Sequence, residues 1–193
     1  AKTLVARLHV ILKALRFHEM NRKRTTSQEE ASMAVSSKAA AQRLCERSKW
    51  RLTNLELQKI LYIAHMNHMG IIGKPLIDGY FEAWDYGPVV PEVYHTVKMF
   101  GAEPIGDFVF PPTKIEDLSS EAKALDKTYG ILAGASPGKL VAITHREGGA
   151  WEKHYNPKEH GIIIPNKDIA REFKDRIYRQ RRKKTRNTLN DRK

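Results

Sequence analysis

Apolar residues cover nearly the whole circumference of one segment near the middle of the chain. The stretch NLELQKILYIAHMNHM, residues 54–69, places leucine, isoleucine, tyrosine or methionine on almost every helical face. A helix that is apolar all round is buried on all sides, so we expect this helix at the centre of the fold. Thr53 and Glu56 have the spacing of a capping box at its start, and Gly70 is a typical stop signal at its end.

Shorter segments with helical apolar spacing or helix end signals flank this central helix. A run rich in aromatic residues predicts a short strand over residues 80–84. The polar residues 19–37 are typical of a linker after an amphipathic N-terminal helix. The sequence therefore predicts a mainly α fold, or α+β with a small β element, in a single domain. The predicted helices are 4–18, 37–47, 89–100, 119–134, 137–146 and 166–179.

The net charge of +12 lies at the two ends of the chain. Residues 1–50 carry 11 Lys and Arg against 4 Asp and Glu, residues 51–170 carry 12 against 15, and residues 171–193 carry 11 against 3. Blocks of like charge are typical of solvated tails, so we expect residues 180–193 to be disordered. We divide the chain into an N-terminal helical arm with its linker (1–35), the domain (36–179) and this basic tail.

The composition also bears on partners and location. Basic ends without interleaved aromatic residues predict only weak, salt-sensitive attraction to nucleic acid. A single cysteine, Cys45, makes an intrachain disulfide framework impossible and favours a reducing cytoplasm. The sequence contains no run of 18 apolar residues, the length that would indicate a membrane span. An association with nucleic acid through the basic ends, as in a phage or mobile-element protein, is the alternative function left open by the charges.

The segment FEAWDYGPVVPEVY, called here the corner segment (residues 81–94), combines four large aromatic residues with two prolines and a glycine. Gly87 and Pro88 predict a turn, because glycine frees the backbone and proline fixes it. One interpretation is structural, with Trp84 and Tyr94 anchored in the core. The other is a rigid docking surface for another protein, since exposed aromatic residues bind at low entropic cost.

Candidate catalytic groups are sparse. His65 and His68 form an H-x-x-H pair on the central helix, but nothing in the sequence completes a metal site, so packed histidines are expected. The block THREGGAWEKH offers His145, Glu147 and His154 for acid–base chemistry, without a recognisable nucleophile. Nucleotide-binding glycine motifs and C-x-x-C pairs are absent. We predict no enzyme activity, no cofactor and no metal.

The region from Thr53 to Gly101 resembles the core motif of the Panacea domain family, found in SocA-like antitoxins and phage-associated GepA-like proteins. The resemblance rests on an L-x-L-Q-K-x-L-Y helix, a P-L turn and an E-A-W-x-x-G-P-V-x-P-x-x-Y segment, and it continues more weakly to about Lys174, including the HREGGAW block. The family residues are Leu57, Gln58, Lys59, Leu61, Tyr62, Ala83, Trp84, Gly87, Pro88, Val89, Pro91, Tyr94 and Trp151.

This resemblance implies a small non-enzymatic antitoxin that binds and neutralises a co-encoded toxin in the cytoplasm. One branch of the family delivers its toxin to a protease, so a protease is a further implied partner. The motif is shared among proteins with different toxins and is expected to be structural, with Trp84 and Tyr62 largely buried. Replacing Trp84 with Ala is then expected to cost about 3–5 kcal/mol.

Specificity for one toxin is more naturally placed outside the shared motif. Residues 102–117 have no helical periodicity that directs their apolar side chains inward. We select Phe108, Val109 and Phe110 in this loop as the candidate partner-binding residues. The alternative is an ordinary strand in which alternate residues of this trio are buried.

Overall fold

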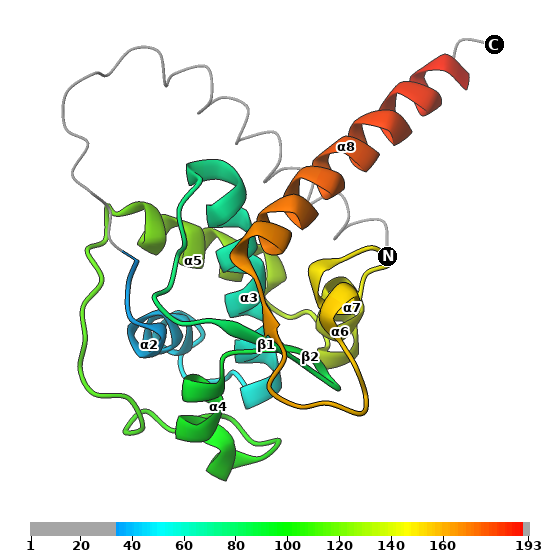
Figure 1. The fold of residues 1–193 in the computed structure, drawn as a ribbon. Coiled ribbons are helices and arrows are strands. Elements are labelled where there is room, and N and C mark those ends of the chain that lie inside the picture. Colours follow the sequence, from blue (N-terminus) through cyan, green and yellow to red (C-terminus); the bar gives the residue numbers. More distant parts are fainter. Residues whose placement is uncertain (1–33, 191–193) are drawn as a thin grey trace.

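The computed structural model describes residues 34–190, and it describes side chains for residues 34–179. The helix predicted over residues 4–18 lies outside this range. The described chain forms one mainly helical domain with a small sheet, as the sequence predicts (Figure 1). Its elements are α2 (Ser37–Arg47), α3 (Asn54–Ile72), β1 (Phe81–Trp84), β2 (Gly87–Val89), α4 (Pro91–Val97), the 3-10 helix η1 (Lys98–Phe100), α5 (Ser120–Leu132), α6 (Pro137–Thr144), α7 (Ala150–His154), β3 (Ile163–Ile164) and α8 (Asn166–Asn190).

Helix α3 runs through the middle of the domain, and α2, α5, α6 and α8 pack around it (Figure 1). Every residue from 57 to 68 is buried, which confirms the prediction from the all-round apolar pattern. The capping box is also confirmed, because Glu56 N donates to Thr53 Oγ1 over 3.4 Å and Thr53 N donates to Glu56 Oε2 over 2.9 Å. These two bonds satisfy amides that the first turn would otherwise leave unpaired.

The predicted end of α3 at Gly70 is wrong. The helix continues to Ile72 and ends at Gly73, whose left-handed backbone (φ 80°) is a typical helix terminus. A Cβ atom on Gly70 would lie 2.0 Å from a ring carbon of Phe173 in α8. The glycine is therefore required by the close packing of α8 on α3, and it does not end the helix.

Three short antiparallel strands form a sheet in the order β2-β1-β3. The strand predicted over residues 80–84 is confirmed as β1, whereas β2 and β3 were not predicted. Trp84 pairs with Gly87 across a two-residue turn, which makes β1 and β2 a tight hairpin. Val89 completes β2, so α4 begins at Pro91 and not at residue 89.

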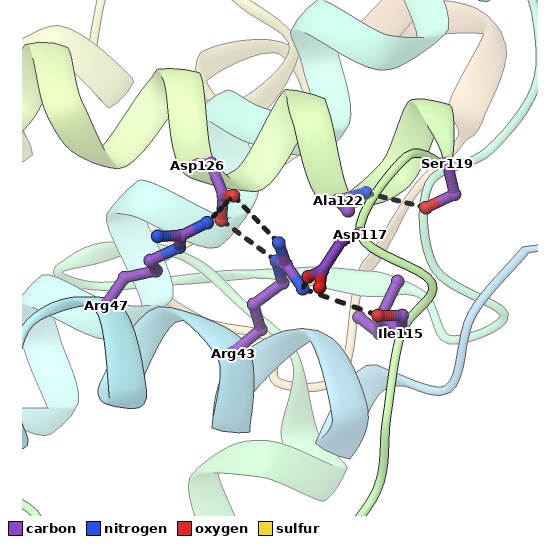
Figure 2. A network of polar contacts seen from close by, with 7 residues as sticks. All are labelled: Arg43, Arg47, Ile115, Asp117, Ser119, Ala122 and Asp126. Carbon is purple, nitrogen blue, oxygen red and sulfur yellow. Dashed lines mark hydrogen bonds and ion pairs between the residues drawn. The ribbon is translucent and has the colours of Figure 1, made fainter.

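An arginine network ties α2 to α5 and to the loop before α5 (Figure 2). Arg43 donates from Nε and from one terminal nitrogen to the two carboxylate oxygens of Asp126, at 2.9 and 2.8 Å, and from the other terminal nitrogen to Asp117 at 2.8 Å. Arg47 also donates to Asp126. Burial alone would raise the pKa of Asp126, but the hydrogen bonds from both arginines lower it below its ordinary value. Such bidentate, charge-assisted bonds fix the relative position of the elements they join.

Helix α8 extends to Asn190, beyond the predicted end at residue 179. The expected disorder from residue 180 is therefore corrected over residues 180–190. Arginine, lysine and glutamine dominate this stretch, and all three favour helix. In the described part of the chain, no helix is both long and apolar enough to cross a membrane.

Candidate functional site

Two polar residues of the family motif, Gln58 and Lys59 in α3, bind the backbone of the corner segment. Val90 N donates to Gln58 Oε1 over 2.8 Å, and Lys59 Nζ donates to Pro88 O over 2.9 Å. β2 is an edge strand, so these backbone groups have no neighbouring strand to pair with. The two side chains satisfy them, and Lys59 is almost completely buried in doing so.

Gly87 leaves room for this arrangement. A Cβ atom there would lie 3.0 Å from both Lys59 Nζ and His145 Nε2, and its φ of 104° is strained for any other residue. Burial lowers the pKa of Lys59 from its ordinary value to about 7. Burial, and then the charge of Lys59, also lower the pKa of His145. The lowered pKa values therefore disfavour the state in which Lys59 and His145 are both charged beneath the hairpin.

A buried polar network joins α3 to α7 and α8. Tyr62 Oη and Ala150 N both donate to Glu172 Oε2, each over 2.8 Å. Arg176 donates from Nε to Glu172 Oε1 over 2.9 Å and from a terminal nitrogen to Ile143 O over 2.7 Å. Tyr62 has no exposed surface, which confirms its predicted burial. The carboxylate of Glu172 is thus neutralised and hydrogen-bonded, as a buried charge requires.

Trp151, from the HREGGAW block, contacts the hairpin. Its Nε1 donates to Trp84 O over 2.8 Å. Its ring stacks on His145 with 3.6 Å between ring centroids and on Tyr155 with 4.6 Å. Pro91, another family residue, occupies the first turn of α4. Four further family residues of α3, β1 and β2 are apolar and buried. These residues are Leu57, Leu61, Ala83 and Val89.

Trp84 departs from its predicted position. It is only partly buried, because β1 alternates: Phe81 and Ala83 face the core, and Glu82 and Trp84 face the opposite side. Trp84 Nε1 donates to Glu82 Oε2 over 2.8 Å, and its ring meets that of Tyr94 edge-on with 4.7 Å between centroids. Trp84 is therefore less buried than Tyr62, and it lies on the face of β1 opposite the core.

Trp84 instead forms the wall of a cleft of about 630 Å³. The first turns of α3 supply one side of this cleft, the outer face of β1 and the turn supply another, and α4 with residues 159–161 closes it. The lining residues are Asn54, Leu55, Gln58, Lys59, Glu82, Ala83, Trp84, Asp85, Tyr86, Val89, Tyr94, Lys98, Gly101, Glu159, His160 and Gly161.

The motif residues identify a known family. Residues 57–152 match the family described as "Antitoxin SocA-like, Panacea domain". The chain is 30% identical over 142 residues to "Antitoxin SocA" of Caulobacter vibrioides (strain NA1000 / CB15N), which covers 67% of this chain and 74% of that protein. This chain belongs to the SocA-like Panacea family. No solved structure matches it significantly.

The histidines of this Panacea domain take separate partners. His65 Nε2 bonds to Asn166 Oδ1 at 3.0 Å, while the two ring nitrogens of His68 contact Lys74 O and Ser120 Oγ. Burial lowers the pKa of His65 to about 4, and it also lowers the pKa of His68. Within the described residues, no three His, Cys, Asp or Glu side chains are grouped to hold a metal.

The residues of the rival acid–base interpretation are also engaged elsewhere. His145 stacks on Trp151, and His154 Nε2 bonds to Asp168 Oδ2 at 3.0 Å. Glu147 lies exposed between them in sequence. The structure thus gives each of the three residues a different environment.

The three candidate partner-binding residues of the loop differ in their exposure to solvent. Phe108 is 74% exposed, Val109 is partly buried and Phe110 is only 5% exposed. The loop is not a strand, so neither sequence interpretation describes it fully. Phe110 belongs to the buried hydrophobic core.

Several cleft residues were missed from the sequence, among them Asn54, Tyr86 and Glu159. Asn54 and Tyr86 flank motif residues but match no pattern of their own. The signal that existed was the alternation F-E-A-W, which separates Glu82 and Trp84 from the core face. Glu159 lies far away in sequence and carried no such signal.

Proposed function

We propose that this protein is an antitoxin that neutralises a co-encoded toxin by binding it directly. The observation that carries the proposal is the similarity to "Antitoxin SocA" over most of the chain. An antitoxin of this kind needs a stable scaffold and an exposed surface, and it needs no catalytic group. The chain has both features at the corner segment, which is rigid on one side and open to the cleft on the other.

The chemistry of the cleft favours binding over catalysis. Its walls carry aromatic side chains, and its lining, within the described part of the chain, contains no serine, threonine or cysteine. Tyr86 is 72% exposed at the turn. Large, rigid, exposed aromatic residues are typical of protein interfaces.

We propose that the contact surface continues from the cleft to Phe108. Met99 and Phe108 are both exposed, and the ring of Phe108 lies 5.9 Å from that of Phe100. Lys98 and Gly101 line the cleft on either side of Met99 and Phe100 in sequence. Of the three loop residues proposed from the sequence, only Phe108 is suited to contact a partner, since Phe110 is buried.

Co-expression tests the proposed function. The product of the adjacent open reading frame is expressed in a bacterial host alone and together with this protein. We expect growth arrest from the first alone, rescue by the second, and a one-to-one complex of the purified full-length chains by calorimetry. Absence of toxicity, or rescue without any detectable complex, would contradict direct neutralisation.

The fate of the toxin separates two mechanisms. If this protein acts by blocking its toxin, the toxin level in rescued cells stays constant after synthesis is stopped. If it delivers the toxin to a protease, as one branch of the family does, the toxin level falls within minutes and rescue depends on that protease. We propose blocking by direct contact in the cytoplasm as the primary mechanism.

A further inference from the structure

The cleft is acidic, although the protein as a whole is strongly basic. Three carboxylates line it, from Glu82, Asp85 and Glu159. In the described part of the chain, none of the three forms an ion pair with a lysine, arginine or histidine. Against them stand Lys98, His160 and Lys59, of which Lys59 is buried and has a pKa lowered to about 7. The open side of the cleft therefore attracts cations.

The aromatic residues of the cleft suit the same ligand. Trp84, Tyr86 and Tyr94 all line it, and the first two belong to the hairpin that also carries Glu82 and Asp85. Aromatic rings attract a guanidinium or ammonium group through their faces. Carboxylates beside such rings add charge-assisted hydrogen bonds. The combination is typical of a site for an arginine or lysine side chain.

The floor of the cleft holds two incompletely satisfied amides. Gln58 Nε2 and Asn54 Oδ1 are buried, and neither has a hydrogen-bond partner among the described residues. The two residues are one helical turn apart, and both line the cleft. One atom is a donor and the other an acceptor, which matches the C=O and N–H of a peptide group. Leaving such buried groups unpaired is unfavourable; because each atom has less than 1 Å² of accessible surface, a ligand pairs them once the two side chains turn toward the cleft.

We propose that this cleft binds an extended, basic segment of the toxin, with an arginine or lysine between the aromatic wall and the carboxylates and a peptide group over Gln58 and Asn54. The proposal rests on the proposed antitoxin function and adds the chemistry of the bound segment. It assigns Glu82, Asp85 and Glu159 to recognition of charge, and Trp84, Tyr86 and Tyr94 to the aromatic wall.

The basic C-terminal end of the chain itself is not the occupant. Helix α8 starts beside β3 and carries residues 180–190 away from the hairpin and α4 (Figure 1). At about 1.5 Å per residue, its 25 residues span about 37 Å. The remaining basic segment of the chain, which contains Arg22, Lys23 and Arg24, is the competing occupant that the test must address.

The first measurement uses the full-length protein and short peptides as probes. Spectra of ¹⁵N-labelled protein resolve the indole N–H signals of Trp50, Trp84 and Trp151, assigned with a Trp84→Phe variant. We expect the blocked peptide Gly-Arg-Val-Arg-Gly to shift the Trp84 signal and leave Trp50 in place, whereas Gly-Glu-Val-Glu-Gly shifts neither. An unmoved Trp84 signal, or equal effects of the two peptides, would overturn the proposal.

The second measurement uses the toxin and a matched pair of charge reversals. The variant Asp85→Lys/Glu159→Lys changes two cleft carboxylates, and Glu116→Lys/Glu147→Lys changes two exposed carboxylates outside the cleft. We expect the first to weaken toxin binding at least 10-fold and the second less than 2-fold, with both thermal midpoints close to the wild type. Equal affinities of the two variants would overturn the cleft proposal while the antitoxin function stands.

Two further outcomes complete the test. If the wild-type protein does not bind the product of the adjacent open reading frame, the proposed function fails, and the peptide spectra still decide the chemistry of the cleft. If replacing Arg22, Lys23 and Arg24 with Gln tightens binding of the arginine peptide more than 10-fold, the cleft is occupied by its own chain. That result would overturn the assignment of the cleft to a toxin segment.

Discussion

The two faces of strand β1 have opposite characters. On the inner face, Phe81 and Ala83 contact the core, and Gln58 Oε1 and Lys59 Nζ nearby pair with the backbone of the corner segment. On the outer face, Glu82 and Trp84 border an open cleft whose carboxylates have no cationic partner in the described chain. The inner face accounts for the fold, and the outer face is available for binding. One short motif therefore supplies the structural contacts and the proposed recognition surface.

The inner face depends on a few buried polar residues. Gln58 and Lys59 hold the hairpin, and Glu172 collects hydrogen bonds from α3, α7 and its own helix. Each of these groups is buried, so removing one partner leaves the other without a hydrogen bond to protein or to water. The outer face has no such dependence, since its side chains reach water. Substitutions on the two faces should consequently differ in kind.

The largest expected effect comes from Glu172→Ala. It removes the carboxylate that neutralises the buried Arg176 and accepts from Tyr62 Oη and Ala150 N. Leaving a buried charge without its partner costs about 3–5 kcal/mol. Denaturant unfolding of the variant measures this loss. The matched cleft variant Glu159→Ala should keep the wild-type midpoint, and equal losses in the two variants would remove the distinction between the faces.

A smaller loss is expected from Gly70→Ala, at about 1–3 kcal/mol, because the new methyl group collides with the Phe173 ring. Gly130→Ala is the control. Gly130 also lies in a helix, α5, but has open space where the Cβ would be. It should gain up to about 1 kcal/mol from helix propensity. Thermal unfolding of both variants checks the opposite signs, and a stable Gly70→Ala variant would contradict the tight α3–α8 contact.

Lys59 predicts a pH dependence of stability. Its pKa is about 7 in the folded protein and about 10.4 in an unfolded chain. Between these values the unfolded state binds more protons, so the free energy of unfolding rises with pH; the contribution is lost as pH falls from about 10.4 to about 7. We expect wild type to gain up to about 2 kcal/mol over Lys59→Met between pH 7 and pH 9. Parallel pH profiles of the two proteins would mean that Lys59 keeps an ordinary pKa.

The two motif tryptophans provide a further contrast. Trp151 is 8% exposed and hydrogen-bonded to the backbone of β1, whereas Trp84 is partly exposed in the cleft. Trp151→Ala should cost about 3–5 kcal/mol. Trp84→Ala should cost about 1–2 kcal/mol, less than a buried tryptophan, because part of its ring already contacts water. Chemical denaturation decides the order, and a larger loss for Trp84 would place it in the core.

The sequence predicted the fold better than it predicted the site. The capping box at Thr53 and the apolar run to His68 located α3, since both are local signals. Gly70 was misjudged because its reason, the Phe173 ring, lies about one hundred residues away. The cleft was not predicted for the same reason: Glu159 is distant from the hairpin in sequence, and the β1–β3 pairing brings it close. Signals within one element are visible in a single sequence, and contacts between distant elements are not.

Hydrogen–deuterium exchange of the full-length protein, with and without the product of the adjacent open reading frame, tests the division of the two faces most directly. We predict that the complex slows exchange in residues 82–86, 94–101 and 159–161, which border the cleft. Residues 166–179 of α8, on the side of the buried Glu172 network, should exchange at the same rate in both states. Protection confined to α8, with unchanged exchange around the cleft, would contradict the account.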